Sequence, residues 1–146
     1  MKIAVPVNDL LNVYKHNPHT APKFVIYDLV KLENEVRFSL DSIVENTLSL
    51  HKNHLFRSEA ITGDCEKEEK ENIVHKCEHY SLLEMIGGCS YLLANRCCEN
   101  TKKSMKQSGI GVFKIPSIIN KTDMAIQNFI IGEFIASKIQ NIHNVS

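Results

Sequence analysis

The sequence predicts an α/β protein in which helices pack on a mixed five-stranded sheet, with the element order βββαβαβα. Three β-rich runs stand close together near the start of the chain, at residues 2–7, 23–30 and 36–44. From about residue 64 onward, helical patterns alternate with short aliphatic runs, an order typical of parallel strands joined by right-handed crossovers. The 146 residues suit a single domain that spans the chain, because a chain of ~150 residues buries roughly 68–70% of its unfolded surface.

The three early runs are predicted to form a meander. Lys2–Val7 is aliphatic and ends at Asn8-Asp9, and its Pro6 is expected near the strand end because proline lacks a ladder donor. Only a short polar turn separates the second and third runs, so we expect an antiparallel hairpin. The third run alternates apolar and polar residues between positions 36 and 41, which indicates a half-exposed strand.

Glycine and proline mark the ends of the later elements. After a long irregular connection at about 45–63, a helix is predicted to begin at Asp64 and to stop at Gly87-Gly88. The further elements are a strand at 89–95, a helix at 98–108, a strand at 110–115 and a long helix capped by Thr122.

Charge and hydropathy exclude several functions. Seventeen basic residues balance seventeen acidic ones, so the chain lacks the positive surface of a general nucleic-acid binder. No apolar run approaches the ~20 residues that span a bilayer, and the apolar stretch after Lys2 is too short for a signal peptide. We therefore expect a cytoplasmic protein with neither nucleic acid nor membrane as a partner. In that compartment the five cysteines are expected to be thiols or metal ligands rather than disulfides.

Four stretches, in order along the chain, resemble one protein family. They are the start MKIAVPVND, the segment 19–28 (HTAPKFVIYD), the strand 109–113 (GIGVF) and the helix 122–132 (TDMAIQNFIIG). Together they resemble the dinitrogenase iron–molybdenum cofactor biosynthesis family, which includes NifX-like proteins and the C-terminal domain of NifB-like proteins. The resemblance implies a ribonuclease-H-like three-layer fold and a noncatalytic role in nitrogen fixation, carrying an iron–molybdenum cofactor or its iron–sulfur precursor. The implied partners are nitrogenase or cofactor-assembly proteins.

Two loops of the family pattern are altered in this chain. The first, which we call the histidine loop (residues 8–22), reads HNPHTAP at its end, so either His16 or His19 can hold the family's histidine position. The second, which we call the cysteine turn (residues 95–98), has Asn-Arg-Cys-Cys in place of a glycine-rich turn. The resemblance therefore assigns cofactor binding to six residues: His16, His19, Asn95, Arg96, Cys97 and Cys98.

The expected metal ligands are His19, Cys97 and Cys98, because imidazole and thiolate suit iron and related metals. The two cysteines stand at the predicted start of a helix, where free amides and the positive end of the dipole stabilise a thiolate. In the resembled fold the first and fourth strands are parallel neighbours. The histidine loop and the cysteine turn should then open at one edge of the sheet, where α/β proteins bind ligands.

Alternative functions remain open at this point. The adjacent Cys97-Cys98 pair would suit a thiol-based redox or regulatory binding module. Asp9, Asp28 and Asp41 are the carboxylates available to a metal-dependent, nuclease-like enzyme, although the first strand lacks the acidic residue that such a fold normally carries there. A homodimer that associates through an apolar edge is the last alternative. Cys89 opens the predicted fourth strand, and eight strand residues span roughly 26 Å, so Cys89 and Cys97 are too far apart to bind one metal together. Cys89 is therefore expected to be a core residue.

Overall fold

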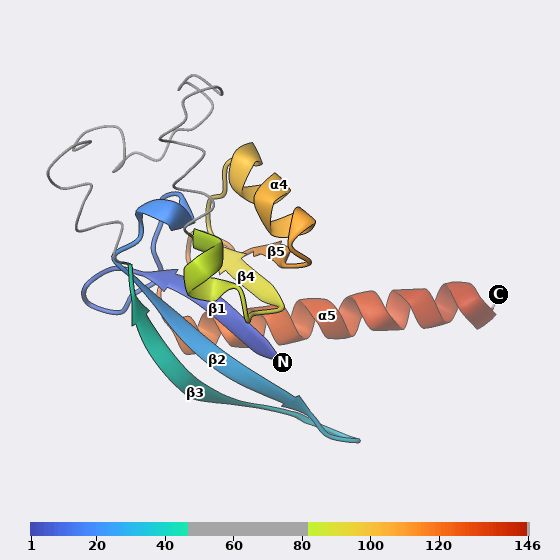
Figure 1. Cartoon of the computed structure of the whole chain (residues 1–146). Helices are drawn as coiled ribbons and strands as arrows, with labels where there is room; N and C mark the ends of the chain where they lie inside the picture. The colour runs from blue at the N-terminus through green and yellow to red at the C-terminus, as the bar shows by residue number, and fades with distance from the viewer. Residues whose placement is uncertain (47–81, 146) are drawn as a thin grey trace, which may run out of the picture.

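Five strands form one mixed sheet in the order β3-β2-β1-β4-β5 (Figure 1). They are β1 (Lys2–Val7), β2 (Lys23–Lys31), β3 (Val36–Glu45), β4 (Tyr91–Ala94) and β5 (Gly111–Lys114). The β1–β2 and β2–β3 pairs are antiparallel, whereas β1–β4 and β4–β5 are parallel. The predicted mixed sheet and its early hairpin are confirmed.

The computed structural model describes residues 1–46 and 82–145. The predicted connection beyond residue 46 and most of the helix predicted from Asp64 lie outside these residues. The last turn of that helix, at residues 82–86, is described, and it ends directly before Gly87-Gly88 as predicted.

The first strand of the chain lies in the middle of the sheet, and its composition explains this place. Ile3 through Val7 are all buried, as expected for a strand that is covered on both faces. Pro6 stands one residue before the strand ends, so its missing donor costs little there. Its carbonyl accepts a hydrogen bond from the Tyr14 amide at 2.9 Å, which turns the chain back across the strand end.

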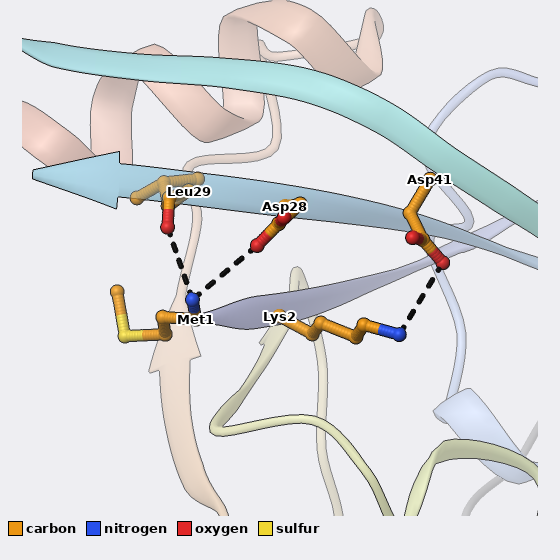
Figure 2. Close-up of polar contacts among 5 residues, drawn as sticks. All are labelled: Met1, Lys2, Asp28, Leu29 and Asp41. Carbon is orange, nitrogen blue, oxygen red and sulfur yellow. Dashed lines mark hydrogen bonds and ion pairs between the residues drawn. The ribbon is translucent and has the colours of Figure 1, made fainter.

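Charged groups hold the amino end of β1 against the hairpin (Figure 2). The Met1 ammonium lies 3.3 Å from Asp28 Oδ1 and donates to the Leu29 carbonyl at 3.0 Å. Lys2 Nζ lies 3.6 Å from Asp41 Oδ2. These groups are partly exposed, so each ion pair is worth no more than about 1 kcal/mol, and their main effect is to set the position of the strand.

A bulge in β3 explains why its alternation of apolar and polar residues is only partial. Leu40 lies opposite Tyr27, but the next partner of β2, Ile26, lies opposite Ser42, so Asp41 is the extra residue. One inserted residue moves every following side chain to the other face. Ile43 therefore lies on the same face as Leu40, and both are about half exposed.

Helices cover the two faces of the sheet and make a three-layer α/β fold. Alternate residues of the inner strands belong to different cores, as the period of two requires. On one face, Ile126 and Phe129 of α5 (Thr122–Val145) pack on β1, β2 and β4. On the opposite face of the sheet, the helical turn at 82–86 and Met105 of α4 (Glu99–Gln107) pack on the same three strands. Figure 1 shows that α5 continues past the edge of the sheet.

The helix α4 ends in a Schellman motif that leads the chain into β5. Gly109 has φ 77°, a left-handed conformation that glycine adopts without a Cβ penalty. Its amide donates to the Lys106 carbonyl at 3.1 Å, and the Ile110 amide donates to the Met105 carbonyl at 2.8 Å. Ile110 and Met105 also share one core, so the motif fixes where the strand enters the sheet.

Candidate functional site

The parallel strands place three loops at one edge of the sheet. Ile3 lies opposite Tyr91 and Ala4 opposite Leu92 in the β1–β4 pair, and β5 runs parallel to β4. The histidine loop after β1, the cysteine turn after β4 and the segment 115–121 after β5 therefore leave from the same edge. The expectation that the first and fourth strands are parallel neighbours is confirmed.

The histidine loop contains a short 3-10 helix, η1 (Pro18–Thr20), and His19 is its middle residue. Proline at its first position is pre-set for the turn, and the Thr20 amide donates to the Asn17 carbonyl at 3.0 Å. The hydroxyls of Tyr14 and Thr20 are hydrogen-bonded at 2.8 Å. The His19 side chain is only 1% exposed, so it is a buried histidine.

His16 lies in the same loop in a different environment. Its side chain is exposed, and its ring meets the Tyr14 ring edge-on with centroids 5.4 Å apart. Of the two candidate histidines, His16 is the one that a ligand can reach without a change in the loop, whereas His19 requires the loop to open.

Asn46, which the sequence did not single out, holds the backbone around His19. Its Nδ2 donates to the His19 carbonyl at 3.0 Å and to the Ala21 carbonyl at 2.7 Å. Its own amide donates to the Pro22 carbonyl at 2.9 Å. The side chain is 1% exposed, and a buried amide with two carbonyl acceptors fixes the loop more strongly than a solvated one.

Lys15 ties the histidine loop to the segment that follows β5. Its Nζ donates to the Ser117 carbonyl at 2.8 Å and to the Ile119 carbonyl at 2.5 Å. Desolvation by burial lowers the pKa of this ammonium. A backbone bond from the Val13 amide to the Asn120 carbonyl, at 2.8 Å, joins the same two segments. Two of the three loops at this edge are therefore one connected structure.

The cysteine turn presents its four residues differently. Asn95 Nδ2 donates to the Ile115 carbonyl at 3.2 Å, so its amide joins the ends of β4 and β5. Arg96 is exposed and Cys97 is half-buried. Cys98 is buried at the N-cap position of α4, where its Sγ lies 3.2 Å from Thr101 Oγ1. Arg96 is thus the exposed residue of the turn, Cys97 is partly covered, and Cys98 is enclosed.

The prediction of a stabilised thiolate at Cys97 is wrong. The pKa of this thiol is raised to about 12, above all by desolvation and then by the neighbouring Cys98. Lys102 lowers the pKa and Glu99 raises it, both to a smaller extent. Desolvation is the largest of these effects, so Cys97 is a protonated thiol at neutral pH.

The raised pKa of Cys97 predicts a pH-dependent stability. A thiol in the unfolded chain titrates near pH 9.0, and the folded thiol titrates at about 12. The stability contributed by the folded thiol is therefore fully present below pH 9.0 and is lost as the pH rises toward 12. We expect the difference in unfolding free energy between the wild type and Cys97→Ser to decrease over this range in urea titrations. A difference that stays constant with pH would contradict the burial of this thiol.

The remaining candidate ligands do not gather at a point. Within residues 1–46 and 82–145, no three His, Cys, Asp or Glu side chains are close enough together to hold a metal ion. His19, Cys97 and Cys98 are therefore not a ready-made site for a single ion, and their role toward a cluster of several metals stays a prediction. Cys89 is 8% exposed and belongs to the core below the 82–86 turn, as predicted.

The carboxylates considered for a nuclease lie apart. Asp28 and Asp41 engage the Met1 and Lys2 ammonium groups beside the amino end of β1, whereas Asp9 follows the carboxyl end of the same strand.

None of the helices in the described residues combines the length and the apolar composition that a membrane span requires.

The mixed sheet, with helices on both faces and three loops at one edge, belongs to the class of three-layer α/β proteins. One comparison with solved structures agrees with this class. No protein-family model and no curated protein matches the chain. Among solved structures, the chain is similar to a Thermotoga protein with a provisional NifB assignment in the DUF35 family, studied by NMR. The two share 22% identity over 90% of this chain and 88% of that one, with a TM-score of 0.50. The protein PH0822 is 16% identical over 78% of each chain, with a TM-score of 0.47. At such identity the Thermotoga structure shows a common fold alone.

Proposed function

We propose that this chain is a noncatalytic carrier of a metal–sulfur cluster, either an iron–molybdenum cofactor or its iron–sulfur precursor. The observation that carries the proposal is the parallel pairing of β1 and β4, which sends the histidine loop and the cysteine turn out of the same edge. Carboxyl ends of neighbouring parallel strands are where α/β proteins bind ligands. We further infer a ribonuclease-H-like fold, because β2 runs opposite to the other four strands in the order β3-β2-β1-β4-β5.

The groups at this edge suit a cargo larger than one ion. Ligands of a multinuclear cluster bind different metals, so they do not have to converge as the ligands of one ion do. His16 and Arg96 are exposed and can meet an arriving cluster, and a guanidinium suits an anionic cluster or its organic acid. His19, Cys97 and Cys98 would then provide the softer ligands.

The high pKa of Cys97 fits transient binding. A protonated thiol must give up its proton when metal binds, so protons compete with the cargo at neutral pH. This competition weakens the complex and favours release to an acceptor. We expect nitrogenase or cofactor-assembly proteins as donor and acceptor in the cytoplasm, a context that the NifB assignment of the Thermotoga protein supports. The separation of Asp9 from Asp28 and Asp41 favours a role without metal-dependent hydrolysis.

Anaerobic reconstitution tests this function. The purified chain is mixed with ferrous iron and sulfide, or with isolated iron–molybdenum cofactor, then desalted and examined for bound metal and visible absorbance. We expect the wild type to retain a coloured cluster. The triple variant His19→Ala, Cys97→Ser, Cys98→Ser should bind at least about tenfold more weakly, as expected when ligands or their supporting groups are removed.

Cys89→Ala is the matched control, because it removes a thiol that is buried in the core away from this edge. It should retain the cluster as the wild type does. A folded wild-type chain that takes up neither cluster without oxygen would disprove the proposal. Equal loss in the control would show that uptake reflects stability rather than these ligands.

A further inference from the structure

The outward side of α5 is apolar although nothing in the described part of the chain is seen to pack on it. Met124, Ile131 and Ile135 are 52%, 58% and 52% exposed. They fall within about 40° of one another around the helix at 100° per residue, on the side roughly opposite the buried Phe129. A helix that is apolar on both sides is typical of one that is covered on both sides.

Figure 1 shows that the C-terminal part of α5 runs beyond the sheet. Gly132 still meets the sheet, since a Cβ there would lie 2.9 Å from the Phe113 ring. The helix nevertheless continues to Val145. Helices in proteins gain most of their stability from packing rather than from propensity, so this extension is expected to have a further packing partner.

We infer that α5 packs antiparallel on α5 of a second copy of this chain, about a two-fold axis beside Ile131. The exposed positions Met124, Gln127, Ile131 and Ile135 recur at spacings of three and four residues, the spacing at which one helix packs along another. The two-fold axis sets Ile131 against Ile131 of the second copy and Gln127 against its Ile135. This inference does not depend on the proposed function.

Charge favours a second copy over a charged partner. The exposed positions between Met124 and Ile135 on this side carry no charge, since Asp123 lies about 100° away around the helix and Glu133 lies on the opposite side. A two-fold interface brings the same surface from both copies together, so an uncharged row avoids burying like charges. Antiparallel helices also place the positive end of one dipole beside the negative end of the other. One helix per subunit makes a small interface, so the dimer should be of moderate affinity.

Sedimentation equilibrium over a concentration series in the micromolar range tests this dimer. We expect the wild type to associate reversibly into dimers and Ile131→Glu to weaken association at least about tenfold, equivalent to about 1.4 kcal/mol. Ile118→Glu is the matched control, because Ile118 is 84% exposed on the loop after β5 and lies off the α5 row. It should dimerise as the wild type does. Circular dichroism should show both variants folded.

A cysteine at the axis gives a second measurement. Ile131→Cys should form a disulfide-linked dimer under mild oxidation, whereas Ile118→Cys and the wild type should not. A wild type that stays monomeric through the series would overturn the inference. Binding of that monomer to lipid vesicles or to another protein would then show that α5 has a different partner. Dimers that survive Ile131→Glu, or that fail to cross-link through Ile131→Cys, would overturn it as well.

Discussion

Replacing Phe129 by alanine is expected to lower the free energy of unfolding by about 3–5 kcal/mol. The ring is 1% exposed, and it lies between the Tyr91 and Phe113 rings, with centroids 4.8 and 5.2 Å away. The substitution removes both aromatic contacts and opens a cavity between α5 and the sheet. Urea denaturation followed by circular dichroism would measure the loss.

The matched control for Phe129 is Ile118→Ala, which truncates an apolar side chain that is 84% exposed. Its effect should stay within about 0.5 kcal/mol, as is usual for exposed sites. Similar losses in the two variants would show that α5 does not pack on the sheet through Phe129.

Asn46→Asp is expected to cost about 2–4 kcal/mol, because the change removes two buried hydrogen-bond donors and sets a carboxylate against the His19 and Ala21 carbonyls. The shape of the side chain is preserved, so the loss reports on hydrogen bonding rather than on packing. A protonated carboxyl regains one donor, so the loss should become smaller as the pH is lowered. Urea titrations at two pH values would show both effects.

Asn120→Asp is the control for this second prediction, since it makes the same chemical change at an exposed position. It should alter stability by about 0.5 kcal/mol or less. If Asn46→Asp is as mild as the control, then Asn46 does not fix the histidine loop. Increased accessibility of His19 in the Asn46 variant, measured by chemical modification of histidine, would support the role assigned here.

Most of the sheet could be predicted from local sequence, because β1, β2, β4 and β5 are mainly apolar runs between polar residues, glycine or proline, whereas β3 alternates apolar and polar residues. The break in alternation after Leu40 has a physical meaning that was harder to recognise. Leu40 and Ile43 are three residues apart and yet share one face, which requires an extra residue in the strand. The sequence shows that the alternation breaks near Asp41, but only the pairing with β2 distinguishes a bulge from an irregular strand end.

The site could be predicted only in outline. Strand order decides which loops share an edge, and the resemblance supplied that order. The backbone on either side of the buried His19 is held by Asn46, which lies 27 residues further along the chain and donates to two backbone carbonyls that have no sequence signature. At Cys97, sequence position suggested a helix start that favours a thiolate, whereas burial, which is a tertiary property, raises the pKa instead.

The central place of β1 has a consequence for how the chain folds. One side of this strand pairs with the hairpin that follows it closely, but the other side must wait for β4, which begins at Tyr91. The entropic cost of closing such a long loop comes before the favourable β1–β4 contacts can form, and this slows folding. During synthesis the open side of β1 is an unpaired strand edge, the kind of surface on which other chains add. Refolding at high concentration should therefore be where this protein is most prone to aggregate.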